Sequence, residues 1–190
     1  MTADFSAISV WAYNANGDWF WVDGVLARQT MDKSIDDLFR LVQEYRPQSV
    51  GVEITGQQNA FIQWLQREQM ERNIWFNFAQ EKNKAGIRPT VNKLSRFNLV
   101  VPLFKAGKVY FPEEMEKSKI MELAMSQLTL ATINGLKGKD DFLDTVSMLM
   151  YMNPWKPSEV SVMSSEDGKY YTDDDDTDDE STSGFASYIV

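Results

Sequence analysis

Two apolar runs joined by a short polar turn constrain the fold most strongly. Residues 7–13 are apolar or aromatic at nearly every position, and residues 19–23 read Trp-Phe-Trp-Val-Asp. Between them lies Asn16-Gly17, a pair that favours a tight turn between strands because both residues tolerate a positive φ. The segment therefore predicts a strongly aromatic β-hairpin.

Helical and strand patterns alternate after this hairpin. Ser34, with Asp37 three residues later, predicts a capped helix with one apolar face that ends before Pro47. We expect further strands at 49–54, 74–78 and 108–111, and further helices at 57–73, 92–105, 117–131 and 140–151. Gly107 and Pro154 are expected to end two of these helices, and residues 134–139 to form a loop. The alternation predicts an α/β fold with a mixed sheet flanked by helices.

The acidic charge of the chain is concentrated at its C-terminal end. From Lys156 onward ten acidic residues face two lysines, a balance of −8, so the total of −9 leaves −1 for residues 1–155. We therefore expect one domain at 1–155 and a disordered acidic tail at 156–190, because the tail has no apolar periodicity. A nearly neutral body with clustered Lys and Arg is compatible with phosphate contacts.

The sequence contains neither cysteine nor histidine. Disulfides, thiolate or imidazole zinc sites and Ser-His-Asp triads are thereby excluded. Any metal must be held by oxygen, which favours Mg²⁺ or Mn²⁺. No apolar run approaches the roughly 20 residues that cross a bilayer, and the start does not resemble a signal peptide, so we expect a cytosolic protein.

Glu53 is unusual because it interrupts a short apolar strand, Ser-Val-Gly-Val-Glu-Ile. A carboxylate in that position costs free energy unless it is paired, protonated or bound to a cation. Two interpretations remain equally open: a strand-end residue that is solvated or paired with Lys or Arg, or a metal ligand.

Asp140, Asp141 and Asp144 begin the last expected helix. A favourable interaction with the helix dipole explains Asp140 and in part Asp141, but explains Asp144 poorly because it lies a full turn inside. Asp141 and Asp144 are three residues apart and therefore share one helix face. Such paired acids, close to a third, are suited to two-metal hydrolysis of phosphodiesters.

Three segments in this order and spacing resemble the nuclease domain of phage large terminases, over roughly residues 4–153. They are Val-Glu-Ile-Thr-Gly-Gln-Gln at 52–58, the region from Asn-Lys-Leu-Ser-Arg at 92–96 to Lys-Ala-Gly-Lys-Val-Tyr-Phe-Pro at 105–112, and Lys-Asp-Asp-Phe-Leu-Asp at 139–144. The resemblance implies a ribonuclease-H-like or resolvase-like fold that cuts concatemeric double-stranded DNA during packaging with Mg²⁺ or Mn²⁺. It also implies that the domain interacts with a terminase ATPase portion, a small terminase or a portal, in the cytoplasm of an infected bacterial host.

The resemblance also assigns residues. It implies that Glu53, Asp141 and Asp144 are catalytic and hold the metal. Lys93 and Arg96 resemble the basic pair near the cleft, where contact with phosphate makes physical sense, although solvated helix charges are an equally good account. Lys84 and Arg88, in the basic stretch just before, are further candidates for contact with DNA.

One departure from the family is large. The segment Asp-Phe-Ser-Ala-Ile that opens the family's second strand lies here at residues 4–8, so the central strand and its essential Asp are missing. We expect a gap in the sheet between the hairpin and the Glu53 strand, with unpaired backbone groups. Three explanations are open: the chain is a fragment of a split or truncated terminase, its start is placed too late, or Asp4 and a rearranged hairpin substitute for the missing strand and its ligand.

Two rival functions therefore stay open. One is a catalytically inactive or incomplete nuclease-like module that binds DNA or packaging partners. The other is a non-enzymatic acidic protein in which the tail is the active part, either competing with DNA or docking on a partner. The phosphate-binding glycine loop of an ATPase does not occur in the sequence.

Overall fold

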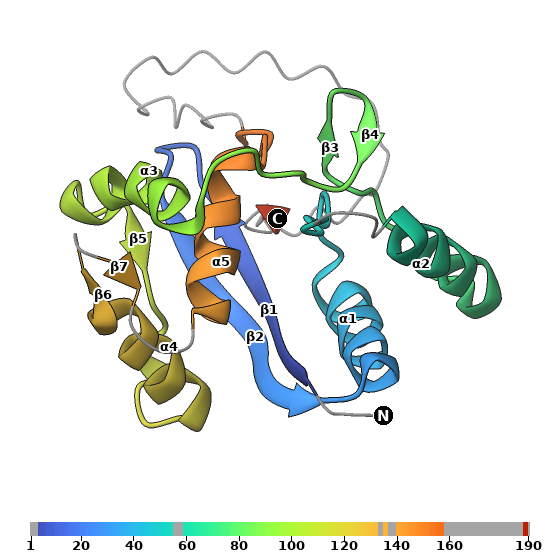
Figure 1. The fold of residues 1–190 in the computed structure, drawn as a ribbon, viewed down its shortest axis with the longest axis horizontal. Coiled ribbons are helices and arrows are strands. Elements are labelled where there is room, and N and C mark those ends of the chain that lie inside the picture. Colours follow the sequence, from blue (N-terminus) through green and yellow to red (C-terminus); the bar gives the residue numbers. More distant parts are fainter. Residues whose placement is uncertain (1–3, 55–58, 133–134, 137–139, 158–187, 190) are drawn as a thin grey trace, which may run out of the picture.

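A computed structural model describes residues 4–54, 59–132, 135–136, 140–157 and 188–189 of the protein. Its centre is a four-stranded mixed sheet in the order β5-β2-β1-β8, with bounds Val109–Tyr110, Trp19–Gln29, Asp4–Tyr13 and Tyr188–Ile189. Helices α1 and α5 lie beside the long β1–β2 hairpin (Figure 1). The described residues include no helix that is long and apolar enough to cross a membrane.

The hairpin predicted at the N-terminus is confirmed and is longer than expected. β1 and β2 pair antiparallel from Asp4 opposite Gln29 to Tyr13 opposite Trp19, with a register shift between Val10 and Trp11. Gly17 in the connecting turn has a φ of 81°, which glycine adopts without strain.

Helix α1 (Met31–Tyr45) begins four residues earlier than a Ser34 cap predicted. Because β2 continues to Gln29, the chain turns directly into the helix, and the side chain of Thr30 accepts the capping hydrogen bond from the Lys33 N–H. The predicted end is confirmed: Arg46 adopts a left-handed conformation before Pro47.

The expected strand at 49–54 is only partly formed. Val50 makes a parallel bridge to Phe78, and Glu53 makes one to Ile87. The N–H groups of Val50 and Ile54 and the C=O groups of Val50 and Val52 all bond to this one side. The segment therefore has an edge like that of a strand, but it does not join the central sheet in the described part of the chain.

Most other expected elements are present. The four predicted helices correspond to α2 (Asn59–Arg72), α3 (Lys93–Lys105), α4 (Lys119–Leu130) and α5 (Asp141–Met148), the last continued by a 3₁₀ turn at Leu149–Tyr151. The strand predicted at 74–78 is reduced to the bridge at Phe78. Part of the predicted loop at 134–139 lies outside the described residues, whereas Gly135–Leu136 form β7, paired with β6 (Ala131–Thr132).

A small hairpin was not predicted. β3 (Gln80–Glu81) and β4 (Lys84–Ala85) pair across Lys82 and Asn83, both with positive φ. A further 3₁₀ turn at Glu113–Met115 follows β5. Of the predicted acidic tail, only β8 and the first residues before 158 belong to the described part.

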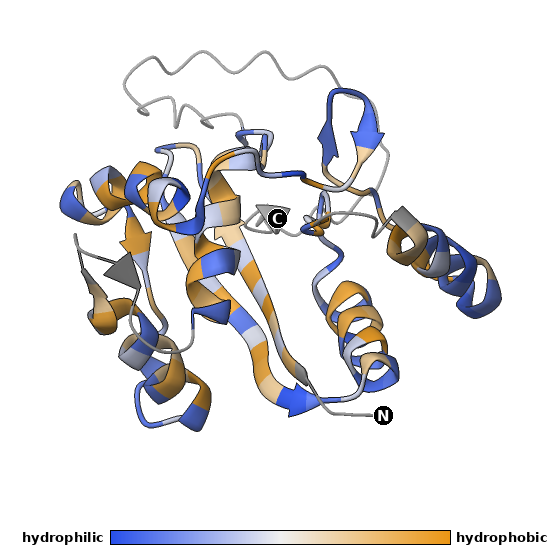
Figure 2. Cartoon of the chain, viewed as in Figure 1, coloured by the Kyte–Doolittle hydropathy of each residue, from blue (hydrophilic) through white to orange (hydrophobic). Residues whose placement is uncertain are grey.

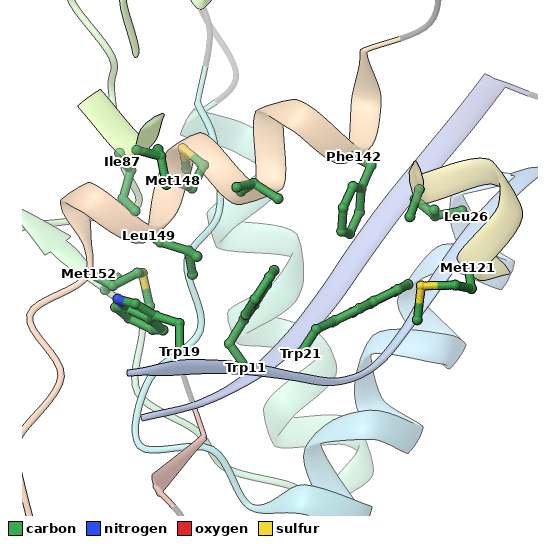
Figure 3. Packing of buried hydrophobic residues seen from close by; sticks show 14 residues of the cluster. Trp11, Trp19, Trp21, Leu26, Ile87, Met121, Phe142, Met148, Leu149 and Met152 are labelled. Carbon is green, nitrogen blue, oxygen red and sulfur yellow. The ribbon is translucent and has the colours of Figure 1, made fainter. Parts of the chain in front are cut away.

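Tryptophans of the hairpin form the main core with α5. Trp11, Trp21 and Phe142 are almost completely buried, and the rings of Trp21 and Phe142 lie 4.9 Å apart between centroids. The tryptophans project from β1 and β2 towards α5 (Figure 3), and hydrophobic residues gather along the hairpin and α5, whereas the β3–β4 hairpin is mostly hydrophilic (Figure 2). This packing fixes α5, and with it the position of Asp144.

Candidate functional site

Arg96 joins the Glu53 segment to α5. Its Nη1 donates to Oε1 of Glu53 at 2.9 Å, and its Nη2 donates to Oδ1 of Asp144 at 3.0 Å. The Arg96 side chain is only 2% exposed, against 27% for Glu53 and 18% for Asp144. Three residues far apart in the sequence therefore form one charged cluster at the border of the core.

The first turn of α3 aims Arg96 and Lys93 in this direction. The side chain of Asn92 caps the helix by accepting from the Ser95 N–H at 2.9 Å. Lys93 and Arg96 are three residues apart and share a helix face. Nζ of Lys93 lies 2.6 Å from Oδ2 of Asp144, and it also bonds both carboxylate oxygens of Asp140 at 3.2 Å.

Burial and charge shift the pKa values within this cluster. Burial raises the pKa of Asp144 above its ordinary value, aided by the nearby charge of Glu53, although the hydrogen bond and charge of Lys93 oppose the shift. Burial alone would lower the pKa of Lys93, but its bonds to Asp144 and Asp140 outweigh that effect and raise it. Lys93 is thus held as a cation beside an aspartate that is costly to ionise.

The carboxylates also border a groove of about 360 Å³. The groove lies between residues 6–11 of β1 and residues 49–53, with α1 on one side and α5 on the other. Glu53, Asp141 and Asp144, the three predicted ligands, all line it. Most of the remaining lining is apolar, so the acids lie at the edge of a hydrophobic channel.

The chemistry of the three predicted ligands suits a hard divalent cation, but their side chains are not arranged to bind one. Carboxylate oxygens on Glu53, Asp141 and Asp144 are the donors that Mg²⁺ or Mn²⁺ prefers. Among the described residues, however, no three acidic side chains are grouped closely enough to hold a metal ion. The guanidinium of Arg96 takes the place between Glu53 and Asp144 that a shared cation would need.

The other predicted site residues lie apart from the cluster. Asp4 begins β1 opposite Gln29, and its side chain is outside the described part. Lys84 lies in β4, and Arg88 follows Ile87, the residue to which Glu53 makes its bridge. Nη1 of Arg88 donates to the carbonyls of Ala85 and Gly86, so this guanidinium supports the hairpin.

Sequence reasoning missed the part played by Asp140. Its position at the helix start was explained by the dipole alone, yet its carboxylate binds Lys93. The burial of Arg96 was also not foreseen, because an arginine in an amphipathic helix is usually exposed. The contact partner of Lys93 lies 47 residues away, and no local pattern reveals such a pair.

Comparison with known proteins gives two findings. A family model described as a terminase RNaseH-like domain matches residues 1–153. Among solved structures, the chain is similar to T. thermophilus RuvC in complex with Holliday junction substrate, at 11% identity and a TM-score of 0.30, over 79% of this chain and 89% of that chain. No curated protein sequence matches.

Proposed function

Because this chain belongs to the family of terminase RNaseH-like domains, we propose that it is a metal-dependent endonuclease domain that cuts concatemeric double-stranded DNA during phage genome packaging. The matching family model confirms two expectations from the sequence, the resemblance to terminase nuclease domains and the ribonuclease-H-like α/β fold. In this proposal the chain works in the cytoplasm of an infected bacterial host, with a terminase ATPase portion, a small terminase or a portal. The domain occupies residues 1–155, followed by an acidic tail.

The convergence of Glu53 and Asp144 on Arg96 is the observation that carries the proposal. Two carboxylates from different elements meet at the border of a groove, and Asp141 lines the same groove one helical turn away. Mg²⁺ or Mn²⁺ bound there would supply activation of a water and stabilisation of the leaving phosphate oxygen. Glu53, Asp141 and Asp144 would hold it, with Asp4 as a further candidate ligand.

The basic residues have the complementary task of holding the DNA backbone. Lys93 is 48% exposed and is the accessible cation of the cluster, so it is suited to a phosphate oxygen. Arg96 is only 2% exposed, so it can reach a phosphate only if the side chains that cover it move. Lys84 and Arg88 would extend the phosphate contacts along the neighbouring hairpin. These contacts carry no sequence information, so we expect low sequence specificity.

A second function is favoured by the sheet itself. No strand lies between β1 and residues 49–53 in the described part, and no acid from such a strand joins the cluster. A catalytically inactive or incomplete module that binds DNA or packaging partners would have this arrangement. The two proposals differ in one measurable property, which is hydrolysis by the chain alone.

Nicking of supercoiled plasmid tests the first proposal. The purified chain is incubated with Mn²⁺, with Mg²⁺ or with chelator, beside Glu53→Ala and the matched control Glu71→Ala. The Glu71 side chain is 60% exposed, and within the described part of the chain its ion-pair partner is Arg67 of the same helix. Metal-dependent nicking that is lost in Glu53→Ala and kept in Glu71→Ala supports the nuclease. No nicking by the folded chain supports the binding module.

The acidic tail is proposed to compete with DNA for the basic residues. Asn in place of Asp173, Asp174, Asp175 and Asp176 removes four negative charges from the intact chain. If the tail competes, this variant binds DNA more tightly at low salt, and the difference shrinks as salt is added. Equal affinity at low salt leaves the tail as a solubilising segment.

A further inference from the structure

Two strand edges face each other across the groove without a strand between them. On one side, β1 carries a partner on its second edge only at Ala12 and Tyr13, which pair with β8 in the described part of the chain. On the other side, Val50 and Val52 bond towards Phe78 and Ile87. The backbone N–H and C=O groups of successive residues point to alternate sides of an extended chain. The residues that alternate with Val50 and Val52 therefore direct these groups away from Phe78 and Ile87.

Those residues are Gly51 and Glu53. Neither has a backbone hydrogen bond in the described structure, and Gly51 is exposed. Unpaired backbone groups cost free energy when they are shielded from water, so an extended segment that bonded to both edges would be stabilised. We call the space between residues 6–11 of β1 and residues 49–53 the strand slot.

The walls of the strand slot define the chemistry of its occupant. Side chains of α1 line one wall, among them Ile35, Leu38 and Leu41, and side chains of α5 and its 3₁₀ turn line the other, among them Met148 and Leu149. A strand in the slot would direct alternate side chains to these two apolar walls. It must therefore be apolar on both faces, as a central strand of a covered sheet is.

The direction of the occupant follows from the packing. Phe142 at the start of α5 lies by Trp21, and Met152, just after the 3₁₀ turn that continues α5, lies by Trp19 (Figure 3). β2 therefore runs opposite to α5, and β1 runs in the same direction as α5. Segment 49–53 runs opposite to α5, because Glu53 connects to Asp144 through Arg96 and Gly51 lies against Met152. β1 and this segment are thus antiparallel to each other.

β8 shows the direction that a strand takes on this free edge of β1. It pairs antiparallel with β1 at Ala12 and Tyr13, at the end of the slot away from Glu53. A longer occupant of the same edge would therefore also run antiparallel to β1.

We propose that the strand slot receives an extended apolar segment of another polypeptide, running antiparallel to β1 and parallel to residues 49–53. The partner adds a strand to the sheet, and its backbone provides most of the recognition. Its length is about six residues, the span of β1 from Ser6 to Trp11 that lines the slot. This inference concerns binding and does not depend on the proposed nuclease activity.

Hydrogen exchange of the intact chain with a peptide probe tests the proposal. The probe has about six alternating valines and alanines between terminal lysines, and its control has the same side chains with N-methylated alternate amides. We expect exchange at the Gly51 and Glu53 amides to slow at least about tenfold with the probe and not with the control. No slowing with the probe, or equal slowing with the control, overturns the proposal.

The same experiment separates the other occupants. Protection of Gly51 and Glu53 in the chain without peptide, independent of protein concentration, would mean that a segment of the chain itself fills the slot. Protection that rises with protein concentration would mean a second copy. Either result overturns the proposal of a different polypeptide, whereas loss of plasmid nicking alone would not affect it.

Orientation is tested by crosslinking, since the chain has no cysteine of its own. Ser6→Cys places a thiol at the end of β1 that lies by the Glu53 end of the slot, replacing a hydroxyl that contacts Ser34 at 2.6 Å. A disulfide should form with a probe that carries cysteine at its C-terminal end. Preferential reaction with an N-terminal cysteine would refute the antiparallel direction.

Discussion

Replacing Arg96 by methionine removes the cation that Glu53 and Asp144 share. Methionine is unbranched and can fill the space of the arginine stem, so the main change is loss of the guanidinium. The variant leaves two carboxylates close to each other at the border of the core, with Lys93 as the nearest remaining cation of the cluster.

The magnitude follows from burial. Removing one partner of a buried ion pair costs about 3–5 kcal/mol. Because Glu53 and Asp144 keep 27% and 18% exposure, water relieves part of the penalty, and we expect the lower end, about 3 kcal/mol of unfolding free energy. A typical domain is stable by only about 5–15 kcal/mol, so the effect is large.

The cost should depend on pH in a defined direction. Burial and the charge of Glu53 already raise the pKa of Asp144, and loss of the Arg96 charge, which opposes that shift, raises the pKa of Asp144 further in the folded variant. The folded state then binds protons more readily, so stability falls as pH rises through the raised pKa and recovers at acid pH. Mg²⁺ should stabilise Arg96→Met more than the unsubstituted chain, because a cation can then occupy the vacated position.

Urea unfolding followed by tryptophan fluorescence measures these differences at neutral and acid pH. The matched control is Arg67→Met, since Arg67 is 66% exposed and pairs with Glu71 at 3.3 Å on the surface, where we expect under about 1 kcal/mol. If Arg96→Met cost no more than this control, or cost the same at acid and neutral pH, Arg96 would not be the counterion of the cluster.

Three further predictions concern other parts of the chain. Burial and the Asp23 carboxylate raise the pKa of Tyr45 to about 12, so the unfolded chain loses the phenol proton at lower pH than the folded chain, and stability falls between about pH 10 and 12. In urea unfolding at alkaline pH, Tyr45→Phe should make this fall in stability smaller. An unchanged dependence of stability on pH would contradict the prediction. Gly86 has a φ of 86°, and a Cβ there would lie 2.4 Å from Cδ1 of Ile54, so Gly86→Ala should lower the urea midpoint by the equivalent of about 1–3 kcal/mol; a neutral result would mean that the β3–β4 hairpin shifts freely. Phe142 is fully buried against Trp21, so Phe142→Ala should cost about 4 kcal/mol in thermal or urea unfolding, and a loss below about 1 kcal/mol would show that α5 does not depend on this contact.

Local signals in the sequence were enough to predict most of the elements. Asn16-Gly17 predicted the hairpin turn. Gly107 and Pro154 predicted helix ends, and in the structure α3 ends at Lys105 and the 3₁₀ turn after α5 ends at Tyr151. The N-cap at Ser34 was wrong because the length of β2 is decided by pairing with β1, which the capping pattern does not contain. Thr30 and Ser34 are both suitable N-cap residues, and the pairing of β1 with β2 as far as Gln29 places the helix start after Thr30.

The candidate site was predictable in its members but not in its contacts. Glu53 was identified because a carboxylate in an apolar strand needs a partner, and the structure provides Arg96. The sequence could not show which cation it would be, since the two residues are 43 positions apart. The resemblance predicted the gap beside β1, whereas the two apolar walls that make it a strand slot follow only from the packing of α1 and α5.

The β1–β2 hairpin has a consequence for the order in which the protein folds. Its strands are joined by a turn of five residues, so its contacts close short loops and form at low entropic cost. The charged cluster instead needs residues 53, 96 and 144 to meet, and each contact closes a loop of more than forty residues. We expect the hairpin to belong to the folding nucleus and the cluster to assemble after the transition state, with φ-values near zero at Glu53 and Arg96. Substitutions in the cluster would then speed unfolding and leave the folding rate almost unchanged.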